Sequence, residues 1–258
     1  MKISIIVRWS LLALLVAFIV SPRRFAPIFE PFTQNGAPAI YTQTSLLSLT
    51  LSHLAIVVIA TTAATIFAVG LAMVVTRPFG VEFLPLSRSI ANIGQTFPPV
   101  AVLALAVPMF GFGPIPTLIA LFLYGLLPIF ENALMGFSTL PPNVTEAARG
   151  VGMTGAQRLA QVEFPLAFPV ILAGIRICVV ISLATATIGS TVAAKTLGEV
   201  IIAGLMSNNT AFVLQGGLIV GILALLIHDG FVMIERAMAR RTGRFHVRRT
   251  AETDGEHP

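Results

Sequence analysis

Long apolar runs separated by short polar intervals dominate the pattern along this chain. The apolar runs cover residues 3–20, 45–76, 83–109, 114–137, 166–193 and 212–234. Each is close to or longer than the roughly 20 apolar residues that a helix needs to cross the hydrocarbon core of a bilayer. Inside lipid every backbone polar group must be bonded within the protein, and uninterrupted runs of this length meet that condition as helices. The pattern predicts an all-α integral membrane protein with about six transmembrane helices.

The first run, residues 3–20, also has the length of a cleaved signal peptide. It lacks a clear small-x-small cleavage site and is followed by Ser21-Pro22-Arg23-Arg24, so we expect a retained first span. The chain then divides into three parts. These are an N-terminal helix with a non-cytoplasmic loop (1–44), a transmembrane core (45–235) and a basic tail (236–258).

The polar interval over residues 143–165 has a helical plan of its own. Two capping-box spacings mark the starts of two helices: Asn143 with Glu146, and Thr154 with Gln157. Gly150 and Gly152 lie between the two starts, where a chain that leaves one helix must bend. Pro165 then opens the next apolar run. We expect two short helices, joined by a glycine elbow, between the fourth and fifth spans.

Composition supports a membrane setting. Charged residues make up 10% of the chain and the mean hydropathy is +0.91, whereas a soluble domain has about 25% charged residues. The net charge of +5 is not arranged as a basic patch interleaved with aromatic residues. We therefore expect contact with membrane lipid and no nucleic-acid partner.

The basic residues predict the orientation of the spans. The six-span pattern puts most of them on one side: Lys2, Arg8, Arg77, Arg88, Arg149, Arg158 and the tail residues Arg236, Arg240, Arg241, Arg244, Arg248 and Arg249. Arg23, Arg24 and Lys195 fall on the other side, and Arg176 lies just inside the fifth span. Because basic residues collect on the cytoplasmic side of a membrane protein, the interval 143–165 is expected to be cytoplasmic.

Catalytic and metal-binding patterns are weak. Residues 189–196 resemble a P-loop, but Ala194 replaces the second glycine and the stretch lies at the non-cytoplasmic end of a span rather than between a strand and a helix. The sequence has neither a His-Glu-x-x-His nor a Gly-x-Ser-x-Gly pattern. Its single cysteine, Cys178, sits in an apolar run and is expected to fill space in the core. We predict no enzyme activity, no cofactor and no metal site.

A few polar or helix-breaking residues inside the spans are candidates for a substrate pathway. Pro98 breaks the third run, and non-helical backbone at membrane depth persists where it is buried or lines a cavity. Tyr124, Glu131 and Asn132 lie in the fourth run, where a carboxylate is costly unless it is paired or hydrated. Glu131 could meet a cationic substrate or lie in water at the cytoplasmic boundary. We expect His53, without an acidic neighbour in sequence, to be a packing residue.

The polar interval resembles the EAA loop of binding-protein-dependent ABC importer permeases. The matching residues are Glu146, Ala147, Ala148, Gly152, Val162, Phe164 and Pro165, with Val162 and Phe164 as apolar departures from the usual Ile and Leu. The resemblance implies a type I ABC importer permease with a cytoplasmic coupling-helix loop that docks in a cleft of an ATPase subunit. The coupling residues would be Glu146, Ala147, Ala148, Gly152, Val162 and Pro165. At the third helical position, Glu146 could bind the partner, cap its own first turn, or both.

The resemblance extends over roughly 45–235 and is greatest to the glycine betaine/carnitine/choline branch. It is carried by Gln95-Thr96-Phe97-Pro98, Tyr124-Gly125-Leu126-Leu127-Pro128-Ile129 and the run from Glu163 to Arg176. The chain departs from that branch at Glu131-Asn132-Ala133, where Arg-Asn-Thr is usual, and at Ala194–Gly198, where a glycine-rich run is usual.

The resemblance implies a bacterial inner (cytoplasmic) membrane location and a small quaternary-amine osmoprotectant as substrate. It also implies three partners: an ABC ATPase subunit, a periplasmic or lipid-anchored substrate-binding protein, and a second permease copy or paralogue. Three other functions stay open. The chain could carry another small solute such as an amino acid, act as a membrane scaffold, or be a self-contained secondary carrier. A carrier needs paired intramembrane charges or an inverted repeat, and the sequence shows neither clearly.

Overall fold

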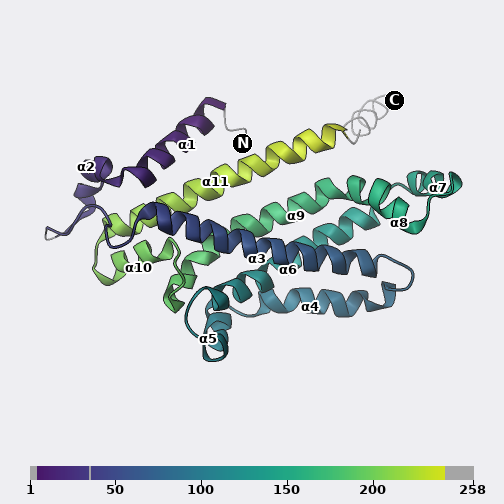
Figure 1. The fold of residues 1–258 in the computed structure, drawn as a ribbon, viewed down its shortest axis with the longest axis horizontal. Coiled ribbons are helices and arrows are strands. Elements are labelled where there is room, and N and C mark those ends of the chain that lie inside the picture. Colours follow the sequence, from purple (N-terminus) through teal and green to yellow (C-terminus); the bar gives the residue numbers. More distant parts are fainter. Residues whose placement is uncertain (1–4, 35, 242–258) are drawn as a thin grey trace, which may run out of the picture.

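The computed structural model describes residues 5–34 and 36–241, and the regular elements in this part of the chain are all helices (Figure 1). The α-helices are α1 (Ile5–Val20), α2 (Ala26–Phe29), α3 (Leu46–Val75), α4 (Leu84–Thr96), α5 (Pro99–Phe110), α6 (Pro114–Ser138), α7 (Pro142–Gly150), α8 (Gly155–Arg158), α9 (Phe164–Thr185), α10 (Gly198–Met206) and α11 (Thr210–Arg241). Shorter 3₁₀ turns cover Pro22–Phe25, Glu30–Phe32, Val81–Phe83 and Ala186–Val192, and a π-turn covers Leu159–Glu163.

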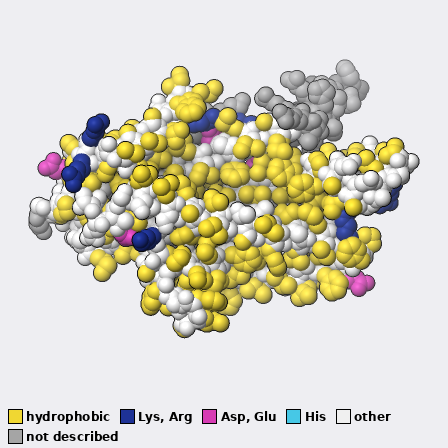
Figure 2. Space-filling view, viewed as in Figure 1, with side chains coloured by type: hydrophobic (Ala, Val, Ile, Leu, Met, Phe, Trp, Pro, Cys, Tyr) yellow, Lys and Arg dark blue, Asp and Glu magenta, His cyan; other side chains and the backbone are white. Residues whose placement is uncertain are grey.

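The described helices agree with about six spans. α3, α6, the continuous stretch Gly155–Val192 and Thr210–Met238 are each long and apolar enough to cross a membrane. Two further crossings are possible if each of two bent helix pairs forms one span, with bends of 111° after α1 and 94° between α4 and α5. Hydrophobic side chains cover most of the face in Figure 2, and charged side chains on it are few. Such a surface suits contact with lipid rather than water.

α3, α6 and α9 form the centre of the bundle, and α11 packs along α9 (Figure 1). Small residues let the three central helices approach closely, as is usual between membrane helices. A Cβ atom on Gly125 of α6 would come 2.6 Å from Sγ of Cys178 in α9. A Cβ atom on Gly174 of α9 would come 2.7 Å from Pro128 O in α6. The buried Cys178 is therefore a packing residue, as expected from the sequence.

The run over residues 83–109 is not one straight span. α4 ends at Thr96, α5 begins at Pro99, and the two helices meet at 94°. Two consecutive prolines remove two backbone donors, and the residue before a proline avoids the helical region, so Phe97 is extended (φ −94°, ψ 136°). The predicted break at Pro98 is confirmed, and its size turns α5 across the bundle.

Two ion pairs join α11 to its neighbours, although the sequence showed no clear pair of charges within the spans. Arg8 of α1 pairs with Asp229, and Arg176 of α9 pairs with Glu235 at 2.7 Å. The sequence also ended the last span at residue 234, whereas α11 continues to Arg241. This extension brings Glu235 within the helix, where it reaches Arg176 well inside α9. Both pairs are neutral overall, which reduces the cost of charge near lipid.

Candidate functional site

The candidate coupling site is built around α7, a short helix at the end of the bundle opposite α10 (Figure 1). The distribution of basic residues predicts that this end is cytoplasmic. α7 buries only Ala148 and leaves Glu146 and Ala147 exposed. The helix starts two residues earlier than the sequence suggested, at Pro142 rather than Val144, and its N-cap is Pro141 instead of Asn143. A proline fits the first helical position because its fixed φ and missing N–H cost nothing there.

The earlier start changes the role of Glu146. Counting from Pro142, Glu146 is the fifth residue of α7, too far along the helix to cap its first turn. Among the residues that the structure describes, Glu146 forms no ion pair. Its carboxylate is exposed on a helix whose other face packs through Ala148. The self-capping interpretation is therefore wrong, and Glu146 is accessible to a partner.

Gly152 closes α7 with a Schellman motif. Its N–H donates to Arg149 O at 2.9 Å, and Met153 N–H donates to Ala148 O at 3.1 Å. Gly152 has φ +80°, a left-handed conformation that glycine adopts without the steric penalty of other residues. The predicted glycine elbow is confirmed at Gly152, while Gly150 is the last residue of α7 itself.

The second predicted helix start is also confirmed. Thr154 accepts a hydrogen bond from Gln157 N–H at 3.3 Å, and Gln157 Oε1 accepts one from Thr154 N–H at 2.9 Å. This helix is not a separate short element, however. α8 passes through the π-turn Leu159–Glu163 directly into α9. Pro165 thus lies within a continuous helical stretch, and the π-turn before it shifts the hydrogen-bond register.

Three charged residues, which we call the Glu163 cluster, join the site to α3. Glu163 lies 2.5 Å from Arg77, two residues beyond the end of α3, and 2.6 Å from Arg158 in α8. The Glu163 carboxylate is almost fully buried, and both arginines are mostly buried. The sequence analysis assigned no role to this group. The position of Glu163, where a polar interval meets an apolar run, is the one feature of the sequence that could have pointed to it.

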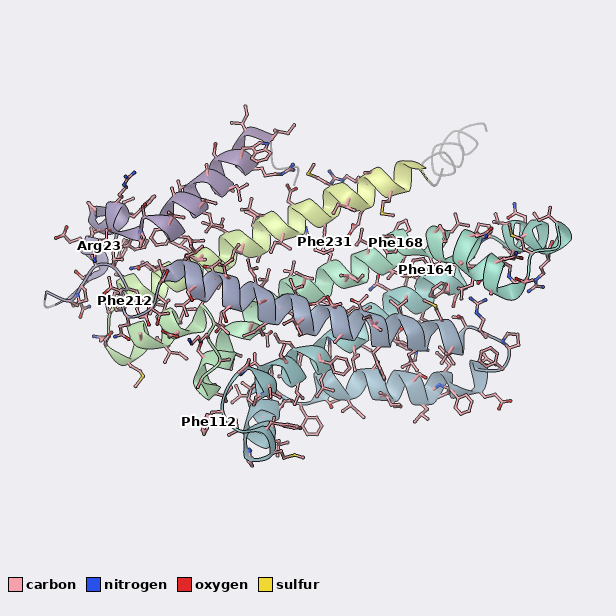
Figure 3. All side chains as sticks on the ribbon, viewed as in Figure 1. Arg23, Phe112, Phe164, Phe168, Phe212 and Phe231 are labelled. Atoms are coloured by element: carbon pink, nitrogen blue, oxygen red, sulfur yellow. The ribbon has the colours of Figure 1, made fainter. Side chains whose placement is uncertain are left out.

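Aromatic side chains pack beside the Glu163 cluster at the start of α9. The ring of Phe164 lies 5.6 Å from that of Phe168 and 6.5 Å from that of Phe137 in α6. Figure 3 shows Phe164 and Phe168 together at the α8 end of α9. Val162 is half-buried in the π-turn before them. The apolar residues of the motif therefore fix the base of α9, whereas Glu146 and Ala147 stay exposed.

Two of the pathway candidates, Pro98 and Tyr124, meet at the break between α4 and α5. The Tyr124 hydroxyl donates to Phe97 O at 2.8 Å, next to Pro98. Pro128 has no N–H for the carbonyl of Tyr124 one turn earlier, and Gln95 Nε2 donates to that carbonyl at 3.3 Å instead. The side chains of α4 and α6 thus complete the backbone bonding that the prolines interrupt, as a membrane setting requires.

The other two candidates point elsewhere. Glu131 forms an ion pair with Arg88 of α4 at 3.0 Å, and both side chains are about half exposed. Asn132 donates to Pro128 O at 2.8 Å and lies against Gly174 of α9. The four candidates therefore do not form one cluster. His53 is fully buried, with Nε2 3.1 Å from Leu183 O and Nδ1 accepting from Leu197 N–H at 3.3 Å, which makes it the packing residue that the sequence suggested.

Groups of side chains that could hold a metal ion were sought among the described residues, and no cluster of three or more His, Cys, Asp or Glu was found there.

The chain is similar to several known transport proteins. The family model described as "binding-protein-dependent transport system inner membrane component" matches residues 68–241. The osmoprotectant import permease protein OsmY of Salmonella typhimurium is 36% identical over 200 residues, which cover 78% of this chain and 85% of OsmY. The glycine betaine/carnitine/choline transport system permease protein OpuCB of Bacillus subtilis is 36% identical over 178 residues, covering 67% and 82%.

The fold is similar to that of solved ABC transporters. A chain of the inward-facing MetNI methionine ABC transporter superposes with a TM-score of 0.65 at 22% identity, covering 75% of this chain and 95% of the other. A chain of an amino acid ABC transporter gives 0.62 at 19% identity, covering 85% and 98%. These likenesses concern the fold and confirm the type I permease architecture expected from the sequence. The family model matches more than half of the chain, and the permease OsmY is 36% identical to it. The chain therefore belongs to the family of inner-membrane components of binding-protein-dependent transport systems.

Proposed function

We propose that this chain is the membrane-spanning subunit of an ATP-driven importer of small methylated ammonium osmoprotectants, and that α7 docks in the ATPase subunit. The observation that carries the proposal is the form of α7, which is exposed at the cytoplasmic end yet joined firmly to the spans. An exposed helix can enter a partner's cleft, and a firm attachment can pass the partner's motion to the membrane part.

Two local features support a rigid attachment. The Schellman motif at Gly152 and the capping box of Thr154 and Gln157 fix the angle between α7 and α8. Beyond them, α8 continues into α9, and the Glu163 cluster links this stretch to α3. Motion of α7 would therefore move α3 and α9 together rather than bend a loop.

The substrate class rests on the relatives. OsmY is named for osmoprotectant import, and OpuCB is named for glycine betaine, carnitine and choline transport. The likeness to methionine and amino acid transporters concerns the fold alone and does not favour an amino acid substrate. As partners we propose an ABC ATPase subunit, a periplasmic or lipid-anchored substrate-binding protein, and a second permease copy or paralogue.

The proposal is tested by reconstituting the purified complex in liposomes and measuring uptake of radiolabelled choline, glycine betaine and carnitine with and without ATP. We expect ATP-dependent uptake of at least one of them. Glu146→Lys or Gly152→Asp should abolish uptake and recovery of the ATPase with the permease, while membrane insertion is unchanged. Glu82→Lys, at an exposed acid outside α7, is the matched control. Uptake that persists without ATP, or that survives both α7 changes, would refute the proposal.

A further inference from the structure

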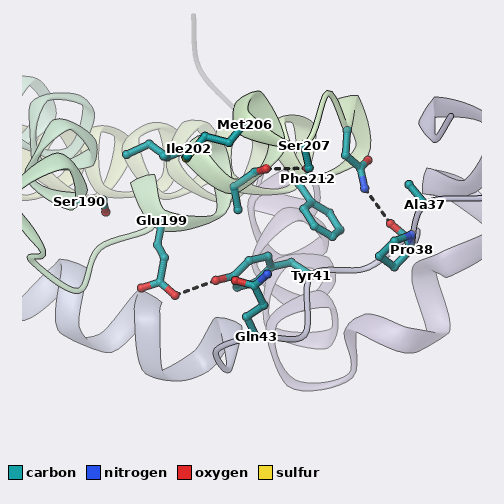
Figure 4. A pocket seen from close by; sticks show the side chains of 12 residues that line it. Ala37, Pro38, Tyr41, Gln43, Ser190, Glu199, Ile202, Met206, Ser207 and Phe212 are labelled. Atoms are coloured by element: carbon teal, nitrogen blue, oxygen red, sulfur yellow. Dashed lines mark hydrogen bonds between the residues drawn. The ribbon is translucent and has the colours of Figure 1, made fainter. Parts of the chain in front are cut away.

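A pocket of about 530 Å³ lies at the end of the molecule opposite α7, between the segment 37–43 and α10 (Figure 4). Its lining combines polar and apolar groups from Tyr41, Gln43, Ser190, Glu199, Met206 and Phe212, among others. The volume falls in the range of roughly 300–1,000 Å³ that is usual for small-molecule sites. By the orientation of the spans, the pocket opens on the non-cytoplasmic side.

Glu199 gives the pocket its charge. Its Oε1 atom accepts hydrogen bonds from the Tyr41 hydroxyl at 2.7 Å and from the Thr44 hydroxyl at 2.5 Å. Its Oε2 atom has no hydrogen-bond partner among the described residues, and the side chain is partly exposed. Of the residues that line the pocket, none is Lys, Arg or His. The described lining therefore carries one negative charge with one carboxylate oxygen free.

Tyr41 and Phe212 are nearly buried and form the aromatic part of the lining. Their rings pack edge to face with centroids 5.4 Å apart, and Tyr41 N–H donates to Gln215 Oε1 at 3.2 Å. Burial and the hydrogen bond to Glu199 raise the pKa of Tyr41 to about 12. The hydroxyl thus keeps its proton at physiological pH and fixes one edge of the carboxylate.

We propose that this pocket is a binding site for an organic cation with a methylated ammonium group, and that it favours cations such as choline over zwitterions such as glycine betaine. A bulky methylated ammonium cannot donate hydrogen bonds, so it binds best where a negative charge lies beside aromatic and other apolar groups. Glu199 provides the charge and Met206 an exposed apolar surface, and the nearly buried rings of Tyr41 and Phe212 line the pocket beside them. A zwitterion would bring a carboxylate next to Glu199, where the described lining offers it no basic partner.

Only the role of this pocket in transport, as the first site that the substrate meets in the permease, rests on the proposed function. Binding itself can be measured without ATP, the ATPase or the binding protein. The probe is choline, compared with 3,3-dimethylbutan-1-ol, which has the same shape but no charge, and with glycine betaine. Ligand-observed NMR on the full chain in nanodiscs reports binding of each compound.

We expect choline to bind, and the neutral isostere and glycine betaine to bind at least tenfold more weakly. Glu199→Gln keeps the size and the acceptor for Tyr41, and it should weaken choline binding tenfold or more. Met206→Lys adds a positive charge at an exposed lining residue and should act likewise, whereas Leu205→Lys, on the exposed neighbour outside the lining, is the matched control.

Equal binding of choline and its neutral isostere, no binding of choline, or unchanged choline binding in Glu199→Gln and Met206→Lys would each overturn the inference. The proposed function would survive these results if ATP-dependent uptake of the osmoprotectants persisted in liposomes. Conversely, charge-selective binding in nanodiscs combined with no ATP-dependent uptake would support the site and refute the importer. The binding measurement thus tests the pocket, and the uptake measurement tests the importer, independently of each other.

Discussion

The Oε2 atom of Glu163 lies 2.5 Å from Nη2 of Arg77, and this contact joins the start of α9 to the residues that follow α3. Arg158 approaches the other carboxylate oxygen at 2.6 Å. One buried acid thus compensates two largely buried cations. Such an arrangement is sensitive to loss of its central member, because both arginines would then face each other without a counter-charge.

Glu163→Gln should therefore destabilise the protein strongly. Breaking a buried charge pair costs roughly 3–5 kcal/mol, and here the neutral amide leaves two arginines uncompensated. We expect a clear fall in the apparent Tm of the detergent-purified protein. Glu131→Gln is the matched control, since its pair with Arg88 is about half exposed and worth about 1 kcal/mol or less. Equal shifts in Tm for the two variants would contradict the prediction.

Gly152→Ala should weaken the α7–α8 elbow, and Gly155→Ala should not. An added Cβ atom meets no other atom within 4 Å at either position, so space does not distinguish the two glycines. They differ in backbone conformation, because Gly152 has φ +80° whereas Gly155 begins α8. A left-handed alanine costs about 1–2 kcal/mol, and asparagine tolerates this conformation better.

The measurement for these variants is the ATPase activity and uptake of the reconstituted complex. We expect Gly152→Ala to lower uptake, Gly152→Asn to restore part of it, and Gly155→Ala to behave like the parent chain. If Gly152→Ala and Gly155→Ala gave the same uptake, the left-handed turn would have no role in coupling.

Gln95→Leu should destabilise the contact between α4 and α6, and Pro128→Ala should relieve much of that effect. Gln95 donates to the Tyr124 carbonyl, whose usual partner one turn later is the missing N–H of Pro128. Leaving an acceptor unsatisfied away from water costs about 1–3 kcal/mol, and an alanine in place of Pro128 would supply the absent donor. Thermal unfolding of the two single variants and the double variant forms a cycle. Simple additivity of the two changes would rule out this compensation.

The raised pKa of Tyr41 predicts a loss of stability at alkaline pH. The phenol titrates at about 12 in the folded protein, against about 10 in an unfolded chain, so folding favours the protonated form. Its contribution is complete below pH 10 and is lost as the pH rises from about 10 to 12. Tyr41→Phe should remove this part of the pH dependence. The apparent Tm, followed together with the ultraviolet absorbance of the phenolate, measures it; an unchanged alkaline slope in Tyr41→Phe would contradict the assignment.

Much of this architecture could be predicted from local sequence. Apolar runs long enough to cross a bilayer located α3, α6, α9 and α11, because the bilayer imposes that length directly. Gly152 and Thr154 were predictable for a similar reason, since each acts through bonds to residues a few positions away. The bend at Pro98 was predicted, but its angle depends on how α6 holds the break.

The errors arose where a partner is distant or where two local signals compete. The spacing of Asn143 and Glu146 suggested a cap, but the preceding prolines started the helix first. The pairs of Glu163 with Arg77 and of Arg176 with Glu235 join segments whose proximity exists only in the folded bundle. The same holds for Tyr41 and Glu199, which are 158 residues apart in sequence and share one hydrogen bond. Residues 242–258 of the predicted tail lie outside the described part of the chain.

The stretch from Gly155 to Val192 has the dimensions of a lever. It contains 38 residues, which at about 1.5 Å per residue span roughly 57 Å, nearly twice the thickness of the hydrocarbon core. One end begins beside α7, and the other carries Ser190 into the wall of the Glu199 pocket. A tilt of about 10° around the middle would displace each end by roughly 5 Å. A small rotation of the end beside α7 would thus change the shape of the Glu199 pocket at the other end of the protein.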